Sequence, residues 1–169
     1  MAELKNSKTE KNLMEAFAGE SQANRKYLAF GKNAERDGYP QVAKLFRAAA
    51  EAETVHAHSH LRTVGGINST ADNLLEAIAG ETHEFKSMYP EMIEDAKAED
   101  NKAALRSFEY ANAVEQVHAN LYENALANMD GMAAADYWVC EVCGYTCENE
   151  APDECPVCKA KKKAFFKVD

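Results

Sequence analysis

The chain has 169 residues, enough for one domain of ordinary size and a small additional one. Hydrophobic residues make up 46% and charged residues 28%, a composition typical of soluble globular proteins. The 28 acidic and 19 basic residues give a net charge of −9, which argues against nucleic-acid binding because that function favours a basic surface. The sequence shows neither a membrane span nor the apolar core of a signal peptide. We therefore expect a cytoplasmic protein that binds neither nucleic acid nor membranes.

Four long segments show the hydrophobic periodicity of amphipathic helices, with apolar residues every three or four positions. They cover about residues 7–37, 40–64, 71–98 and 101–129. The first begins with a capping-box sequence, Ser7-x-x-Glu10. Pro90 is expected to bend or loosen the third, because the proline ring clashes with the preceding turn. The pattern predicts a mainly α fold with a four-helix bundle over residues 1–130.

Metal-binding residue types interrupt each apolar stripe near the middle of its helix. They are Glu20 in the first segment, Glu53 and His56 in the second, Glu81 and Glu84 in the third, and Glu115 and His118 in the fourth. Residues three apart share a helix face, and di-iron bundles use one Glu from each of two helices and Glu-x-x-His from the other two. Glutamates are rarely buried without a compensating charge, so these seven residues are predicted to bind two metal ions as the catalytic site.

The alternative is that these polar residues line solvated helix faces, which would expose Leu45, Met88 and Phe108 instead. Tyr27 and Tyr122 lie one or two turns from predicted ligands. Each is either a hydrogen-bonding residue next to the metal ligands or an ordinary core residue.

A second metal signal follows a predicted linker, residues 131–136. Cys140-x-x-Cys143 and Cys155-x-x-Cys158 are separated by eleven residues, a strong pattern for a tetrahedral thiolate site. Residues 137–169 are too few for an independent apolar core, so a metal is expected to hold short strands together. Spacing alone permits zinc or iron. Cys147 is left over and is expected to be a free thiol.

At this point the chain resembles the rubrerythrins over essentially its whole length. The resemblance rests on the segments Phe17–Ser21, Glu53–His56, Gly80–Glu84, Glu115–His118, Cys140–Tyr145 and Cys155–Cys158. It implies a ferritin-like di-iron bundle followed by a rubredoxin-like domain that binds one iron through four cysteines. It also implies a peroxidase that protects against oxidative stress by reducing hydrogen peroxide to water. Zinc could replace iron at either site.

The resemblance also implies roles for the ligands. The irons would be bridged by Glu53 and Glu115, with Glu20 on the first iron and Glu81 and His118 on the second. Glu84 would bind the first iron in the oxidised state and His56 would replace it in the reduced state. Exchanging an anion for a neutral ligand matches the loss of positive charge on reduction. Electrons would reach the cysteine-bound iron from a rubredoxin or an NAD(P)H-dependent flavoprotein reductase.

The connection at residues 65–71 bears on assembly. It spans at most about 25 Å, whereas the preceding helix is about 38 Å long, so a crossover that keeps the second and third helices parallel is too short. We therefore expect a homodimer in which the first hairpin of one chain packs against the second hairpin of its twin. An up-down-up-down bundle within one chain is the alternative.

Two other functions fit parts of the sequence. A ferritin-like protein that oxidises or stores iron would explain the bundle but leave the cysteine domain unused. A non-enzymatic module with zinc at the cysteines is the other. One position departs from the rubrerythrin pattern: Lys159 stands where the family usually has glycine, and a left-handed conformation there would cost ~1–2 kcal/mol.

Overall fold

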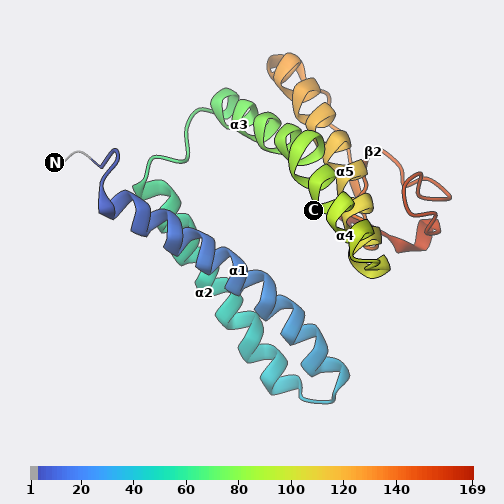
Figure 1. Cartoon of the computed structure of the whole chain (residues 1–169), viewed down its shortest axis with the longest axis horizontal. Helices are drawn as coiled ribbons and strands as arrows, with labels where there is room; N and C mark the ends of the chain where they lie inside the picture. The colour runs from blue at the N-terminus through green and yellow to red at the C-terminus, as the bar shows by residue number, and fades with distance from the viewer. Residues whose placement is uncertain (1–3) are drawn as a thin grey trace. The chain divides into compact units, whose positions relative to one another are not determined.

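The structure is a computed structural model that describes residues 4–169. The chain divides into two compact units, the first ending at Asn68 and the second running from Ser69 to Asp169. Each unit has its own helices (Figure 1). Among the described residues, none of the helices combines the length and the hydrophobicity that crossing a membrane requires.

The first unit is a hairpin of two long helices, α1 (Lys8–Arg36) and α2 (Pro40–Thr63), which lie side by side (Figure 1). The Ser7 hydroxyl accepts a hydrogen bond from the backbone N–H of Glu10 and caps α1 as the sequence predicts. Gly38, with φ +84°, makes the turn between the helices. This is the left-handed conformation that glycine adopts without strain.

Small residues let α1 and α2 approach each other closely. Ala43 and Ala50 are completely buried, and a Cβ added to Gly31 would lie 3.3 Å from the carbonyl oxygen of Ala43. The buried Asn24 side chain donates hydrogen bonds to the Ala50 carbonyl (2.7 Å) and to Thr54 Oγ1 (2.8 Å). Because an unpaired buried amide is costly, these two hydrogen bonds fix the register of the hairpin close to the predicted ligands.

The helices of the second unit are α3 (Thr70–His83), α4 (Tyr89–Ala98) and α5 (Lys102–Ala127). A single π-helical turn, Glu84–Met88, joins α3 to α4, and the backbone N–H of Tyr89 donates to the carbonyl of Glu84. Pro90 follows in the first turn of α4, where a missing N–H is tolerated. The predicted loosening near Pro90 is therefore confirmed as a π turn.

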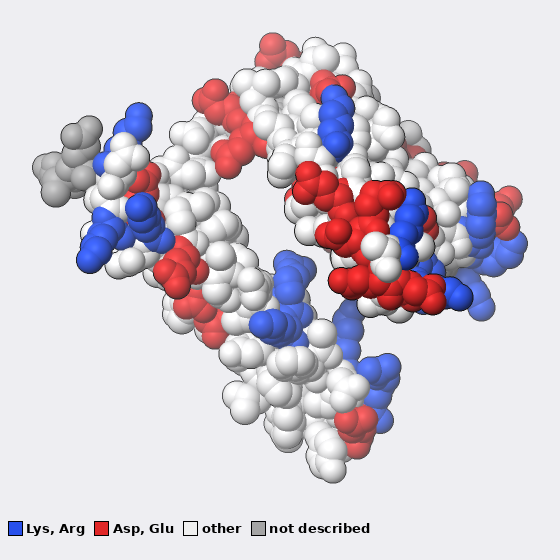
Figure 2. Space-filling model, viewed as in Figure 1, with Lys and Arg blue, Asp and Glu red and all other residues white. Residues whose placement is uncertain are grey.

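Helix α5 packs along both α3 and α4 (Figure 1). Figure 2 shows that acidic side chains gather over α4. The exposed acidic residues in and just after this helix are Glu91, Glu94, Asp95, Glu99 and Asp100. Part of the net negative charge thus lies on a solvated helix face.

The last part of the chain forms a small three-stranded antiparallel sheet in the order β2-β1-β3. The strands are β1 (Tyr137–Cys140), β2 (Thr146–Glu148) and β3 (Phe165–Val168), with 3-10 turns at Met129–Gly131 and Lys162–Ala164. The buried core beneath the sheet consists of Cys140, Ala151, Cys155 and Phe165. Half of this core is cysteine, so a metal bound there would hold the sheet together. The predicted fold class, mainly helical with a small strand region around a cysteine knot, is confirmed.

Lys159 has φ +64°, so its backbone adopts the left-handed conformation. This is the conformation for which an energetic cost is expected when glycine is replaced by lysine. Lys159→Gly is expected to stabilise the cysteine domain by ~1–2 kcal/mol, because glycine has no Cβ to strain the backbone. The measurement is the denaturant concentration at which the iron-loaded cysteine site loses its visible absorbance. Lys163→Gly is the matched control, since Lys163 lies in a 3-10 turn with negative φ and should gain nothing. A Lys159→Gly protein that loses its absorbance no later than the native chain would contradict the strain argument.

Candidate metal centres

The first unit brings together three predicted ligands, Glu20 from α1 and Glu53 and His56 from α2. Their ligand atoms all lie within 4.8 Å of one another. His56 Nδ1 is 2.9 Å from Glu53 Oε2 and 3.9 Å from Glu20 Oε1. Carboxylate oxygens and an imidazole nitrogen at this separation form a donor set that suits iron or zinc.

The second unit repeats this arrangement with Glu81 from α3 and with Glu115 and His118 from α5. His118 Nδ1 is 2.8 Å from Glu115 Oε2 and 3.7 Å from Glu81 Oε1. In both units a Glu-x-x-His pair on one helix therefore faces a glutamate on the neighbouring helix. Each unit supplies one such half of the predicted ligand set.

Negative charge accumulates in the second unit. Burial raises the pKa of Glu81 above its ordinary value, and the negative charge of Glu115 raises it further. Burial and the same neighbouring charge raise the pKa of Glu84, which lies outside the compact group of three. Carboxylates that repel one another in a partly buried site are stabilised by a bound cation, so the electrostatics fit a metal ion.

Tyr89 is a further residue of this site, and sequence periodicity misses it. In a regular α-helix, residues five apart point about 140° away from each other. The π turn closes with five residues, so it brings Tyr89 back to the side of Glu84. Burial raises the pKa of Tyr89, and Glu115, Glu84 and Glu81 raise it further, in that order. Its hydroxyl thus keeps its proton beside the carboxylates.

The two tyrosines singled out in the sequence lie in different surroundings. Tyr27 packs against the rings of Phe30 and Phe46, at centroid distances of 6.4 and 6.1 Å. Tyr122 lines a cavity of about 320 Å³ together with His118 and Thr146. A hydrogen-bonding role beside the metal ligands remains a prediction for both.

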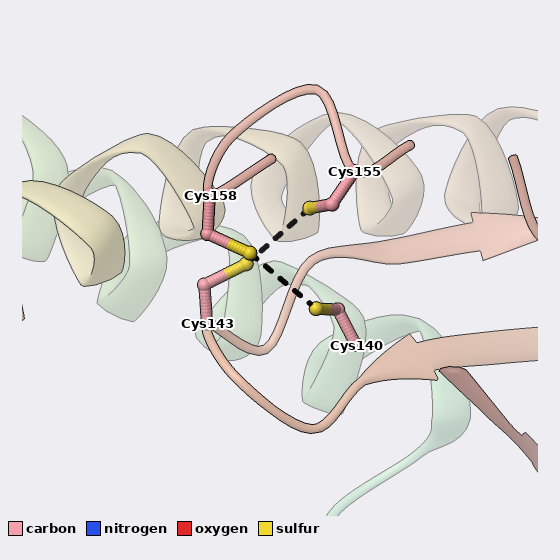
Figure 3. Close-up of side chains that lie close together, drawn as sticks. All are labelled: Cys140, Cys143, Cys155 and Cys158. Carbon is pink, nitrogen blue, oxygen red and sulfur yellow. Dashed lines mark hydrogen bonds between the residues drawn. The ribbon is translucent and has the colours of Figure 1, made fainter. Parts of the chain in front are cut away.

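Cys140, Cys143, Cys155 and Cys158 converge from the two loops of the cysteine domain (Figure 3). Their sulfurs lie within 4.8 Å of one another, and the pairs Cys140–Cys158 and Cys143–Cys155 are each 3.6 Å apart. This is far too long for a disulfide. A metal about 2.3 Å from each of four sulfurs would hold neighbouring sulfurs about 3.8 Å apart, so the geometry fits a tetrahedral thiolate site.

Backbone N–H groups point at these sulfurs. Burial acts to raise the pKa of Cys155, yet the N–H groups of Cys158 and Val157 lower it below its ordinary value. Burial raises the pKa of Cys143 even though the N–H of Tyr145 acts in the opposite direction. Such N–H donors stabilise thiolates and tune the reduction potential of a metal bound to them. Cys147 lies outside the cluster, as the sequence predicts.

The cysteine domain contacts the carboxylate cluster within the second unit. His118 Nε2 lies 3.1 Å from Thr146 Oγ1, the side chain of the first residue of β2. Nearby, a Cβ added to Gly144 would lie 3.7 Å from Val114 of α5. Thr146 is a second residue that sequence reasoning missed, because neither periodicity nor motif spacing relates it to α5.

Comparison with known proteins agrees with both sites. The sequence model of the rubrerythrin family matches residues 11–126, and that of the rubrerythrin rubredoxin-like domain matches residues 138–166. Rubrerythrin-2 of Clostridium acetobutylicum is 37% identical, with 96% of this chain and 97% of the relative covered. The rubrerythrin of Nitratidesulfovibrio vulgaris is 35% identical, with 99% and 97% covered.

Solved structures give the same result. Nigerythrin in its fully reduced, all-ferrous state matches with a TM-score of 0.59 and 34% identity, over 99% of this chain and 91% of that one. Nigerythrin in a partially reduced state matches with a TM-score of 0.59 and 33% identity, over 97% and 91%. The chain therefore belongs to the rubrerythrin family, and its carboxylate, histidine and cysteine clusters fit the iron cofactors of that family.

Proposed function

We propose that the protein is a peroxidase that reduces hydrogen peroxide to water at a di-iron site, with electrons supplied through the cysteine-bound iron. The observation that carries this proposal is the contact between the two kinds of site in the second unit, where His118 Nε2 lies 3.1 Å from Thr146 of the cysteine domain. The balanced reaction consumes one H₂O₂, two electrons and two protons and yields two waters.

The proposed ligands of the two irons are the seven glutamates and histidines predicted from the sequence: Glu20, Glu53, His56, Glu81, Glu84, Glu115 and His118. When bound, the irons supply two electrons and a binding surface for peroxide. These side chains would hold the metals, and the partly buried carboxylates would balance their charge. Burial and the negative charges of Glu115, Glu84 and Glu81 raise the pKa of Tyr89, so its hydroxyl would remain a proton donor on this side of the site.

The cysteine domain is the proposed electron entry. We infer the organisation predicted from the sequence, with di-iron helices at 1–130, a linker at 131–136 and the domain at 137–169. Cys140 and Cys155 are buried, whereas Cys143 and Cys158 are half-buried, so a donor protein could approach the iron from their side. A rubredoxin or an NAD(P)H-dependent flavoprotein reductase is the proposed donor. The cytoplasm, where thiols stay reduced, suits such a site.

A homodimer with exchanged hairpins is the proposed assembly. In the first unit the close helix contact uses small residues, and larger apolar side chains remain exposed, among them Leu45 at 69% and Val55 at 63%. Two helices cannot cover such residues by themselves. Seven chain steps connect Thr63 at the end of α2 to Thr70 at the start of α3, a span of at most about 25 Å. A 24-residue α2 is about 36 Å long, so pairing with a second chain avoids a crossover that this span cannot make.

Removing the cysteine-bound iron tests the electron path. Cys155→Ser should reduce steady-state peroxide turnover with a rubredoxin donor to background, because the route into the protein is lost. Oxidation of the chemically reduced di-iron site by a single dose of peroxide should persist in proportion to the iron that the site retains, which stopped-flow absorbance and iron analysis would show. Cys147→Ser is the matched control and should turn over normally, since Cys147 lies outside the metal cluster. Wild-type turnover in Cys155→Ser would refute the path. Iron uptake without any peroxide turnover in the native protein would favour the iron-storage alternative.

Complementation tests the exchanged hairpins. Glu53→Ala and Glu115→Ala are each expected to be inactive, because each removes a ligand from every site. If a site combines hairpins of two chains, a mixed dimer has one site with both ligands intact and one with neither. Random co-assembly of the two variants should then restore about a quarter of native peroxidase activity. Sites contained within single chains would give no restoration, because every site in every dimer would lack one glutamate.

Glu81→Gln tests whether the carboxylates depend on a metal. A carboxyl whose pKa is raised in the folded state holds its proton more tightly there, so its contribution to stability is present below pH 4.5 and is lost as pH rises through the raised value. At pH 7 the metal-free variant should therefore be more stable than the native chain, and the difference should disappear near pH 4. With iron bound the order should reverse, because a ligand is missing. Thermal unfolding of both forms measures this. Glu76→Gln, an exposed change on the same helix, should show no reversal.

A further inference from the structure

Thr146 and His118 meet through a hydrogen bond whose direction the surrounding atoms determine. Thr146 Oγ1 lies 3.0 Å from the carbonyl oxygen of Gly144 and 3.1 Å from His118 Nε2. A carbonyl oxygen only accepts, and a hydroxyl has one proton to donate. Thr146 therefore donates to Gly144, and its lone pairs face His118. For the second contact to be a hydrogen bond, Nε2 must carry the proton.

This assignment bears on the metal site. A neutral imidazole with its proton on Nε2 has a lone pair on Nδ1. Nδ1 is the atom that faces Glu115 at 2.8 Å and Glu81 at 3.7 Å. Without a metal, these two acceptors favour a proton on Nδ1, which leaves no lone pair on that nitrogen to bind a cation. The hydroxyl of Thr146 favours the opposite tautomer.

We propose that Thr146 is a positioning residue for the carboxylate iron site, whose hydroxyl holds His118 in the orientation and tautomer that leave Nδ1 free to bind iron. The proposal rests on the proposed di-iron function and adds a residue outside the predicted ligand set. Strand pairing makes Thr146 a rigid support, because it lies opposite Val139 in the β1–β2 ladder.

The equivalent histidine of the first unit has no such support. His56 Nδ1 faces Glu53 and Glu20 as His118 Nδ1 faces its own glutamates, but within residues 4–169 the hydrogen bonds of His56 are confined to Nδ1. Its side chain is 56% exposed, compared with 27% for His118. The structure thus holds one histidine at both ring nitrogens and the other at one. This asymmetry agrees with the proposed roles, in which His118 is a permanent ligand and His56 exchanges with Glu84.

Variants at Thr146 in the full-length, iron-loaded protein test the proposal. Thr146→Val replaces the hydroxyl with a methyl group of similar size, which leaves Nε2–H without a partner and keeps water away from it. Thr146→Ala leaves room beside the existing cavity for a water to take the place of the hydroxyl. Thr146→Ser keeps the hydroxyl. Transfer of ferrous iron to a chelator measures retention at the carboxylate site, and the visible absorbance of the cysteine-bound iron reports whether that domain is folded.

We expect Thr146→Val to lose iron fastest and Thr146→Ala to lose it more slowly. Thr146→Ser should retain iron as well as the native chain does. Loss of a hydrogen-bond partner behind a ligand typically weakens metal binding about 10- to 100-fold. Thr146→Val should weaken iron binding at the carboxylate site by a factor in this range, while the cysteine-bound iron is unchanged. The proposal would be overturned if Thr146→Val retained iron as well as the native chain does. It would also be overturned if Thr146→Ser lost iron as fast as Thr146→Val. Because iron retention is measured without peroxide, selective loss in Thr146→Val would uphold the positioning role even if the native protein failed to reduce peroxide.

Discussion

The structure is organised around clusters of partly buried acidic side chains and cysteines, whose negative charges a bound cation would compensate. Burial and mutual repulsion raise the pKa values of Glu81 and Glu84, and two of the four core residues of the cysteine domain are Cys140 and Cys155. In the cysteine domain the predicted ligands are themselves core residues, so the free energy of metal binding there would become part of the stability of the fold.

Local contacts between and within the helices place the predicted ligand side chains close to one another. In the hairpin of α1 and α2, small residues and the Asn24 hydrogen bonds fix the helices at one register, so Glu20 and the Glu53–His56 pair arrive at the same level. In the second unit a π turn interrupts the α-helix beside Glu84 and adds Tyr89 to the ligand face. This irregular turn lies beside the candidate site, as π turns often do in proteins.

Features that depend on residues close together in the sequence could be predicted, whereas features that depend on residues far apart or on an irregular turn could not. Helix periodicity and the Glu-x-x-His and Cys-x-x-Cys spacings are local, so the helices, the cysteine knot and the two groups of three ligands could be predicted from them. Tyr89 could not, because a π turn shifts the periodicity on which the reading relies. Thr146 could not either, because its contact with His118 joins residues 28 positions apart on different elements. The left-handed backbone at Lys159 was anticipated only through the family resemblance.

The two histidines bear on which chemistry the site performs. A protein that stores iron has to release it, and a ligand held at one ring nitrogen only, such as His56, suits release. An enzyme that cycles between oxidation states has to keep its iron while its charge changes, which requires at least one ligand that does not move. His118 suits that proposed role, because Glu115 contacts one ring nitrogen and the cysteine domain contacts the other. A protein made only to store iron does not need a hydrogen bond between a histidine of its iron site and a separate cysteine domain, so the contact between His118 and Thr146 favours the proposed peroxidase over the ferritin-like alternative.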